Sequence, residues 1–351
     1  MKKIISLLLA AALCTATAAC TMSGDPSQEG SVSSASVSSE AESSDPSGAD
    51  PDAQDNYYPV TIQNYNDQKE PVDFVYEKAP ERAVCIWTNS VENMLALGLG
   101  DRIALAAGVS EEEILPEYQE EFAKIAETAP QYPPKEDIVA LEPDFILGWY
   151  STFSSSNYWG ETSFWNDRGV NTYISLNSGL MSEQTIQNEL DDILALGRIF
   201  HVEDKAQEIV DGIEAKVEAG RAYAEGKDPV RVLILENEGD AFRNYGEDSI
   251  GGNIASQVGA EICEPDKSIR IGAEDLFSYD PDVIFAVYFG DEEGRTQCVS
   301  DFMDNPAFAS LSAVQQEKVF PIDLSLIYSP GVRVSNSVDY FLEHLYPEME
   351  S

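Results

Sequence analysis

Short apolar runs alternate with segments of helical periodicity along the chain after Tyr57. Apolar runs bounded by turn residues are typical of buried strands, and a helix at 90–97 follows the first run, with Thr88 or Asn89 as its expected N-cap. A small hairpin, 60–62 with 74–76, is expected before it. Strands separated by helices favour parallel sheets of the α/β class. The strands predicted in this half are 83–87, 103–107, 145–149 and 171–174.

The middle of the chain has a different pattern, because apolar residues recur at helical spacing across residues 182–226. Ile186, Leu190 and Ile193 mark one face, and the same spacing resumes at 206–217 after a break near His201. We predict a single bent helix at 182–226, capped by Ser182, that bridges two lobes. A coiled coil is the alternative, but the apolar stripe covers few heptads and α/β segments flank it.

The last third returns to the α/β pattern, with strands expected at 230–235, 283–287 and 319–322 and helices at 252–258 and 335–345. One motif occurs in both halves. Residues 136–147 and 274–285 each begin with Glu-Asp, continue to an acid-Pro-Asp turn and end in an apolar run. Two copies in register on either side of a long helix indicate two equivalent lobes. We therefore predict an N-terminal lobe at 57–181 and a C-terminal lobe at 227–351.

Residues 1–19 have the order of a secretory signal: two lysines, an apolar run too short to span a bilayer, then small residues. Cys20 follows as in a bacterial lipobox, although Thr17 stands where an aliphatic residue is usual. We expect lipidation of Cys20 and anchoring to the outer face of the cell membrane, with ordinary secretion as the alternative. Residues 20–56 are rich in Ser and acidic residues, and we expect a disordered linker because they offer little apolar surface to bury.

The formal charge of −42 narrows the possible partners. A field of that sign repels phosphate backbones and argues against nucleic-acid binding. The two histidines, His201 and His344, belong to no His-x-x-x-His pair, and the chain has neither a Gly-x-Ser-x-Gly motif nor a phosphate loop. We therefore expect a binding protein without enzyme activity or a cofactor. The shortage of imidazoles also argues against capture of bare zinc or manganese.

Three cysteines lie in the globular part of the chain. Cys85 is expected to be a buried thiol in a strand. Cys263 and Cys298 either form a disulfide in an oxidising compartment or remain free, and their spacing does not distinguish the two.

Taken together, these segments resemble the helical-backbone family of periplasmic binding proteins, which serves importers of iron-siderophore chelates, haem and cobalamin. The resemblance covers about residues 58–347. It implies two lobes joined by one long helix, with the ligand in the cleft between them. It also implies that the chain captures an iron-siderophore chelate for an ABC permease, with cobalamin or haem as the alternative ligand. A surface receptor that does not transport is a further alternative, and we expect a monomer. The matching segments are 80–86, 92–99, 136–147, 196–200, 259–261, 274–285 and 305–308.

The resemblance gives the repeated motif a role. In that family one glutamate on each lobe contacts arginines of the permease, and Glu136 and Glu274 occupy the first position of the two motif copies. Two carboxylates on matching corners of a two-lobed protein steer and orient such a complex. The alternative is that both are first-turn acids that interact favourably with helix dipoles.

Ligands of α/β lobes bind beyond the carboxyl ends of the strands, where this chain carries Trp, Tyr and two arginines. Aromatic faces with a guanidinium group fit a large chelate with anionic oxygens. We expect Arg243 to be the principal contact with the ligand. A positively charged residue in a strand-end loop of so acidic a chain calls for a functional explanation. Each aromatic can instead belong to the core, and Arg333 can instead pair with a surface acid. The predicted ligand-binding residues are Trp87, Thr88, Asn89, Trp149, Tyr150, Arg243, Tyr245, Tyr288, Tyr328 and Arg333.

Overall fold

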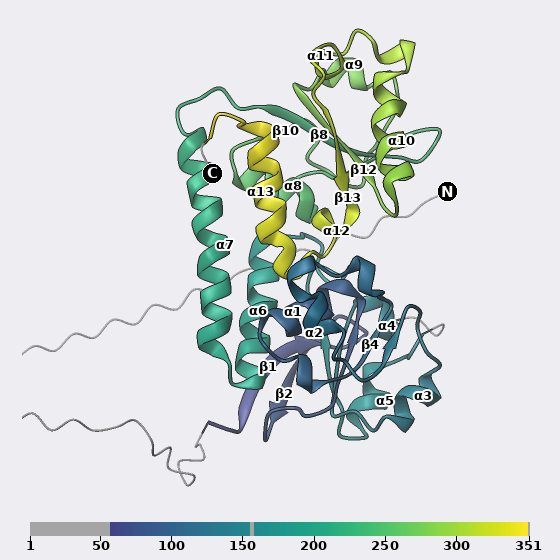
Figure 1. Ribbon diagram of the computed structural model, residues 1–351, viewed down its shortest axis with the longest axis vertical. Helices are drawn as coiled ribbons and strands as arrows, with labels where there is room; N and C mark the ends of the chain where they lie inside the picture. The colour runs from purple at the N-terminus through teal and green to yellow at the C-terminus, as the bar shows by residue number, and fades with distance from the viewer. Residues whose placement is uncertain (1–56, 155–157, 350–351) are drawn as a thin grey trace, which may run out of the picture. The chain divides into compact units, whose positions relative to one another are not determined.

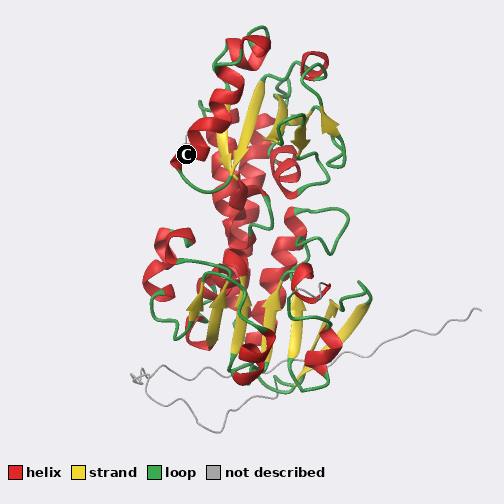
Figure 2. Ribbon diagram, turned by 90° about the vertical axis from the view of Figure 1, so that its right-hand side faces the viewer, coloured by secondary structure: helices red, strands yellow, loops and turns green. Residues whose placement is uncertain are grey.

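The structure, a computed structural model, describes residues 57–154 and 158–349. The predicted signal peptide (1–19), Cys20 and the predicted linker (20–56) lie outside the described residues. Within the described residues the predicted fold class is confirmed. Two lobes each contain a sheet of mostly parallel strands, and helices join them (Figures 1 and 2). The lobe boundaries given above remain predictions.

The N-terminal lobe is built on a five-stranded parallel sheet in the order β5-β4-β3-β6-β7. Its central strands are β3 (Ala83–Ile86) and β6 (Phe145–Gly148), and every residue of both is buried. Alternate residues of β3 belong to different hydrophobic clusters, as expected for a parallel sheet that is covered on both faces. The other regular elements of this lobe are β1 (Val60–Tyr65), β2 (Pro71–Tyr76), α1 (Trp87–Ala96), η1 (Gly100–Arg102), β4 (Ile103–Ala107), η2 (Glu111–Glu113), η3 (Pro116–Tyr118), α2 (Gln119–Phe122), β5 (Thr128–Ala129), α3 (Lys135–Ala140), α4 (Tyr150–Ser154), α5 (Thr162–Asn166) and β7 (Asn171–Ile174).

Two local predictions for this lobe have different outcomes. The predicted hairpin is confirmed, since β1 and β2 pair antiparallel along their whole length. The predicted cap of the first helix is wrong. Helix α1 begins at Trp87 without a side-chain cap, and Asn89 lies inside its first turn.

The C-terminal lobe contains a six-stranded sheet. Strands β8 (Arg231–Asn237), β12 (Val283–Tyr288) and β13 (Val319–Asp323) pair in parallel. The chain reverses after β8, so that β9 (Phe242–Asn244) pairs antiparallel with it and extends the sheet. Residues 242–244, which we expected in a loop, are therefore a strand. The other elements are α8 (Ile250–Gln257), β10 (Glu261–Ile262), β11 (Arg270–Ile271), α9 (Leu276–Tyr279), α10 (Glu292–Met303), η4 (Pro306–Phe308), α11 (Ser312–Gln315), α12 (Leu324–Ile327), η5 (Gly331–Arg333) and α13 (Val334–Leu345).

The bridging segment is a pair of helices and not one bent helix. Helix α6 (Ile186–Phe200) is capped by Thr185, whose hydroxyl accepts the backbone N–H of Asn188, so the predicted cap at Ser182 is wrong. It ends at His201, which has a left-handed backbone (φ 57°). A left-handed residue terminates a helix and redirects the chain. Helix α7 (Glu203–Ala224) then returns alongside α6 to the C-terminal lobe (Figure 1).

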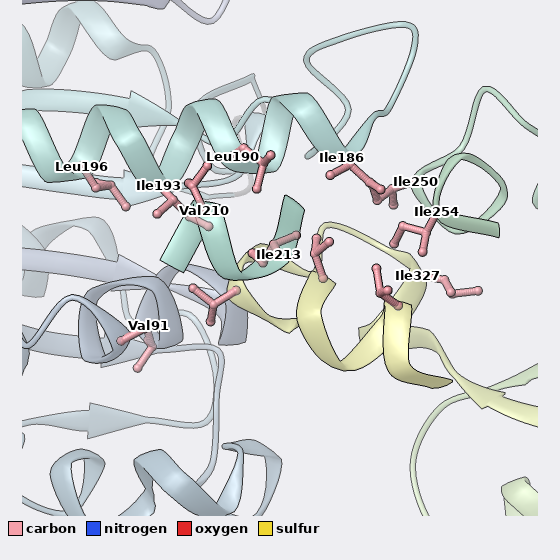
Figure 3. Close-up of a cluster of buried hydrophobic side chains, with 14 of the residues drawn as sticks. Val91, Ile186, Leu190, Ile193, Leu196, Val210, Ile213, Ile250, Ile254 and Ile327 are labelled. Carbon is pink, nitrogen blue, oxygen red and sulfur yellow. The ribbon is translucent and has the colours of Figure 1, made fainter. Parts of the chain in front are cut away.

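One hydrophobic core continues from lobe to lobe through these helices. Ile193 of α6 and Ile213 of α7 belong to the same buried cluster as Val91 of the N-terminal lobe and Ile254 of the C-terminal lobe (Figure 3). Two smaller clusters lie on the other faces of the sheets. Buried apolar surface therefore joins the lobes, in contrast to domains that are connected by an exposed linker.

Two further observations bear on the sequence predictions. Cys85 and Cys298 are buried free thiols and Cys263 is a partly buried one, so the structure contains no Cys263–Cys298 disulfide. Of the helices in the described residues, none is long and apolar enough to cross a membrane.

Candidate ligand-binding site

A cavity of about 520 Å³ lies where strand ends of the two lobes meet. Its walls come from the residues that follow β3 and β6 in one lobe and β12 and β13 in the other. This is the position at which α/β proteins bind ligands. Six of the ten predicted ligand-binding residues line it: Trp87, Thr88, Asn89, Trp149, Tyr328 and Arg333.

Three aromatic rings form a row across the two lobes. The ring centroids of Trp87 and Trp149 are 5.3 Å apart, and those of Trp149 and Tyr328 are 5.4 Å apart. Asn89 holds this row in place. Its side-chain oxygen accepts the indole N–H of Trp149 at 2.8 Å, and its amide nitrogen donates to the hydroxyl of Ser329 at 3.2 Å. The side chain predicted to cap a helix therefore connects the lobes at the cavity.

The backbone of Trp87 has an unusual conformation. Its φ of 69° lies in the left-handed region, which bulky residues rarely adopt. The indole packs over Gly108, where an added Cβ would lie 3.1 Å from Trp87 Cε3. A side chain there would press on the indole, and the φ of 70° at Gly108 also favours glycine. Strained backbone of this kind concentrates at ligand sites.

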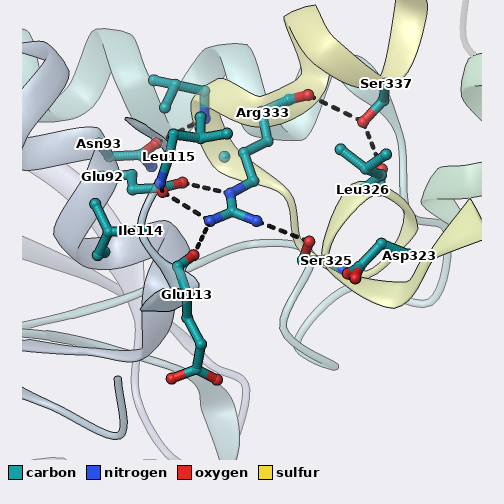
Figure 4. Close-up of polar contacts among 12 residues, drawn as sticks. Glu92, Asn93, Glu113, Ile114, Leu115, Asp323, Ser325, Leu326, Arg333 and Ser337 are labelled. Atoms are coloured by element: carbon teal, nitrogen blue, oxygen red, sulfur yellow. Dashed lines mark hydrogen bonds and ion pairs between the residues drawn. The ribbon is translucent and has the colours of Figure 1, made fainter. Parts of the chain in front are cut away.

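Arg333 forms a buried ion pair with Glu92 at the wall of the cavity (Figure 4). Its Nε and Nη2 donate to the two carboxylate oxygens of Glu92 at 2.6 and 2.7 Å. Nη2 also donates to the backbone oxygen of Glu113, and Nη1 donates to the hydroxyl of Ser325 at 2.7 Å. The pair links α1 of the N-terminal lobe to the C-terminal lobe in a bidentate geometry. Arg333 therefore pairs with an acid, but the expectation of a surface acid is wrong, because Glu92 is fully buried.

The two residues before Arg333 extend this connection. The backbone N–H of Gly331 donates to Glu189 of α6 at 3.0 Å, and that of Val332 donates to the side-chain oxygen of Asn93 at 2.8 Å. All three acceptor side chains (Glu92, Asn93 and Glu189) are buried. Side chains of α1 and α6 therefore fix the position of η5, which forms part of the cavity wall.

Four predicted ligand-binding residues lie outside this cavity. Arg243, in β9, is opposite Glu236 of β8 and forms an ion pair with it at 3.7 Å. Tyr245 is buried, and its hydroxyl donates to the same Glu236 at 2.7 Å. The expectation that Arg243 needs a ligand is thus met by a cross-strand partner within the protein, Glu236. The centre of the Tyr150 ring lies 4.6 Å from the ammonium of Lys69. Tyr288 packs against the smaller hydrophobic cluster of the C-terminal lobe.

Several cavity residues were not predicted. Phe289 is 71 % exposed, although it is a large apolar side chain. Successive side chains near a strand end point in opposite directions, so Phe289 lines the cavity and its neighbour Tyr288 does not. The strand alternation could have indicated this difference. Glu112 and Glu113 lie on a short 3-10 helix that the apolar pattern did not reveal, and Asp323 ends β13.

The two predicted docking acids occupy equivalent surface positions. Glu136 lies in α3 and Glu274 just before α9, and both are exposed. The residue two positions later is fully buried in each copy, and the residue three positions later is an exposed apolar one, Val139 (41 %) or Phe277 (44 %). Each copy therefore presents an acid beside an apolar side chain.

The acidic and sulfur-containing side chains do not gather into a metal centre in the part of the chain that the structure describes. No group of three or more His, Cys, Asp or Glu side chains within 57–154 and 158–349 is arranged to hold a metal ion.

Two α/β lobes that enclose a ligand-sized cavity between their strand ends define a solute-binding protein. The sequence agrees with this class, because the family model for periplasmic binding proteins matches residues 84–325. The chain belongs to the periplasmic binding protein family, as the resemblance implied.

Individual family members show the extent of the similarity. A crystal structure of a periplasmic binding protein from Veillonella parvula is 31 % identical, has a TM-score of 0.77, and aligns over 83 % of this chain and 92 % of its own. The ABC transporter substrate-binding lipoprotein YvrC of Bacillus subtilis is 22 % identical over 296 residues, 83 % of this chain and 87 % of the relative. The petrobactin-binding protein YclQ of the same organism is 24 % identical over 264 residues, 72 % and 78 % of the two chains.

Proposed function

We propose that this chain is the extracytoplasmic binding component of an ABC importer and captures an iron-siderophore-type chelate. The observation that carries the proposal is the row of three aromatic rings, drawn from both lobes, in a cavity of about 520 Å³. Such faces bind large, flat or chelate-like ligands. The names of the relatives support the same role, since YvrC is a substrate-binding lipoprotein of an ABC transporter and YclQ binds petrobactin, a siderophore.

Ligand binding can be tested by tryptophan fluorescence, because two of the four tryptophans line the cavity. The chain from residue 21 onward would be titrated with ferric siderophores, haemin and cobalamin. We expect saturable quenching by at least one ferric siderophore. Quenching by haemin or cobalamin alone would replace the siderophore with that ligand, and no response to any of the three classes would contradict the proposal.

Substitution in the aromatic row gives a sharper test. We expect Trp149→Ala to weaken chelate binding at least about tenfold, because it removes the central ring of the row. The matched control is the adjacent Tyr150→Phe. The hydroxyl of Tyr150 bonds to the backbone oxygen of Asp67, away from the cavity, so this change should leave affinity unaltered. Equal effects of both changes would contradict the assignment of the cavity.

We further propose that Glu136 and Glu274 contact the permease. The support is their exposure at equivalent positions of the repeated motif, each beside an exposed apolar residue. Acids steer and orient an encounter, and apolar contacts add affinity. Neither carboxylate has a hydrogen-bond or ion-pair partner in the described part of the chain, so both are available for a partner.

The docking proposal predicts that substitution of the two acids impairs transport without impairing ligand binding. Glu136→Ala with Glu274→Ala should reduce uptake while the dissociation constant for the ligand stays unchanged. The control is Glu214→Ala with Glu293→Ala, which removes the same charge from exposed positions outside the repeat. Uptake that survives the first pair, or falls equally with the second, would contradict the assignment. It would also favour a receptor role without transport.

The proposed location depends on Cys20. We propose that its thiol carries the lipid that holds the protein at the outer face of the membrane, as the name of YvrC supports. Cys20→Ser should release the protein from the membrane fraction, as fractionation and immunoblotting would show. Retention of the variant in that fraction would contradict the anchor.

A further inference from the structure

The charged groups on the cavity wall are mostly acids. Glu112, Glu113 and Asp323 line it together with one cation, Arg333. If the guanidinium of Arg333 were free, it could still attract an anionic group of a ligand. The hydrogen bonds of Arg333 therefore decide which ligand charge the cavity accepts.

The guanidinium of Arg333 is already neutralised. Both carboxylate oxygens of Glu92 accept from it, and the side chain of Glu92 is fully buried behind the wall. Two further acceptors, the backbone oxygen of Glu113 and the hydroxyl of Ser325, take other N–H groups. An anionic ligand would have to compete with a bidentate buried carboxylate for this cation. Of the described residues that line the cavity, none offers another Lys, Arg or His side chain.

The acids on the wall differ in what they can still bind. The carboxylate of Glu113 accepts from the backbone and hydroxyl of Ser110 and points away from Arg333 (Figure 4). Asp323 accepts the N–H of Ser325 with one oxygen at 2.8 Å, which leaves its second oxygen without a partner among the described residues. Glu112 is exposed and has no hydrogen-bond partner there. Two carboxylates on opposite lobes are thus free to accept from a ligand.

The aromatic rings favour the same ligand charge. The faces of Trp and Tyr attract cations through their quadrupole, and Trp87, Trp149 and Tyr328 form a continuous row of such faces. The rest of the protein adds a field of the same sign, because the whole chain has a formal charge of −42.

We infer that the cavity selects chelates that are uncharged or cationic at their surface, and that a protonated amine of the ligand binds between the aromatic row and the carboxylates of Glu112 and Asp323. This inference rests on the proposed chelate-binding function. It reverses the expectation of an anionic ligand that we drew from Arg243, which is paired with Glu236 outside the cavity.

The test uses three ferric complexes of one linear trihydroxamate that differ only in their terminal group. The first ends in a primary ammonium, the second in its uncharged N-acetyl derivative and the third in its N-succinyl derivative, which carries a carboxylate. Dissociation constants would be measured by tryptophan quenching with the chain from residue 21 onward. We expect affinity to fall in that order, by roughly fivefold per unit of charge at low ionic strength.

Two pairs of substitutions assign the effect to named residues. Glu112→Gln with Asp323→Asn keeps the size of both side chains, and the introduced asparagine retains an oxygen that can accept the N–H of Ser325. We expect this variant to bind the three complexes with nearly equal affinity. Glu214→Gln with Glu293→Gln changes the net charge equally at positions outside the cavity, and should preserve the order.

Each outcome decides one question. The expected order in the wild type, lost only in the cavity variant, supports the inference. Tightest binding of the succinyl complex, or an order that survives Glu112→Gln with Asp323→Asn, overturns it and leaves chelate binding intact. If ferric tris-catecholate complexes bind and none of the hydroxamates does, the inference also falls and the proposed function stands. If no ferric chelate binds, both fall together.

Discussion

Three buried charged residues lie where the C-terminal lobe meets α1 and α6. Glu92 and Glu189 are fully buried, and the side chain of Arg333 is only 9 % exposed. Burial of a charge is costly unless partners satisfy it, so each of these groups should have a measurable effect on stability. Glu92 and Arg333 neutralise each other, whereas Glu189 has only uncharged hydrogen-bond donors. We therefore expect substitution of Arg333 to lower stability and Glu189 to make stability depend on pH.

Loss of Arg333 should destabilise the fold strongly. Arg333→Met removes the ion-pair partner of a fully buried carboxylate, and an uncompensated buried charge costs about 3–5 kcal/mol. Urea denaturation followed by circular dichroism would measure the loss. Arg333→Met combined with Glu92→Gln should recover much of it, since the introduced glutamine is neutral and can still accept the backbone N–H of Leu115. If Arg333→Met lowered the free energy of unfolding by less than about 1 kcal/mol, the pair would behave as an exposed one, and this account would be contradicted.

Glu189 should make stability depend on pH. Burial raises the pKa of its carboxyl to about 7, although hydrogen bonds from Asn177 and Gly331 act in the opposite direction. The folded state then holds the proton more tightly than the unfolded chain. The contribution of this carboxyl to stability is therefore greatest below its unfolded pKa, and declines as pH rises from about 4.5 through about 7.

The change Glu189→Gln removes that titration. Whatever its absolute stability, the variant should gain stability relative to the wild type as pH rises from about 5 to about 8. Denaturation midpoints across this range would measure the difference. The control Glu214→Gln alters an exposed carboxyl of α7 and should follow the wild-type pH dependence. Parallel curves for Glu189→Gln and the wild type would show that Glu189 does not titrate in this range.

At the scale of elements, the close contact of α6 with α7 depends on one glycine. An added Cβ at Gly197 would lie 2.5 Å from the Cβ of Ala206 on the opposite helix. Gly212 of α7 is different, because an added Cβ there would meet nothing within 4 Å. The same substitution at the two positions should therefore have opposite effects.

We expect Gly197→Ala to destabilise the protein by about 1–3 kcal/mol, because the overpacked helices must separate. Gly212→Ala should stabilise it by about 0.5–1 kcal/mol, because alanine is the better helix former and nothing obstructs it. Thermal unfolding would compare both. Ala206→Gly should rescue the first variant, and a stabilising effect of Gly197→Ala would show that α6 and α7 do not pack this closely.

At the scale of the whole molecule, the joint between the lobes is packed and hydrogen-bonded. The shared hydrophobic core and the bonds of η5 to α1 and α6 must both change if the lobes move far apart. Packed interfaces resist continuous deformation. The cavity should therefore be largely formed before the ligand arrives.

Small-angle X-ray scattering of residues 57–351 with and without a bound chelate would test this. We expect the radius of gyration to change by less than about 1 Å, as in other preorganised complexes. Breaking the joint with Arg333→Met should increase the change on binding. A contraction of several ångströms in the wild type would instead indicate a freely hinged protein.

The apolar pattern by itself predicted the main strands of both sheets, the hairpin and helices α1, α8 and α13. The repeated motif indicated the two lobes, and the order and spacing of the segments carried the resemblance to the family. Those features depend on local periodicity and on the order of segments. For the same reason, six of the residues chosen by the strand-end rule line the cavity, among them Trp87 and Trp149, while their role in ligand binding stays a prediction. The position of a residue after a parallel strand already places it at one edge of the sheet.

Only the tertiary structure decided the remaining features. The left-handed His201 turned one expected helix into two, and strand β9 moved Arg243 from an expected loop to a cross-strand pair with Glu236. The partner of Arg333 is Glu92, far away in the sequence, so no local pattern contains it. Which charges are neutralised, and therefore which ligand charge the cavity accepts, depends on distances between segments that the chain brings together only when it folds.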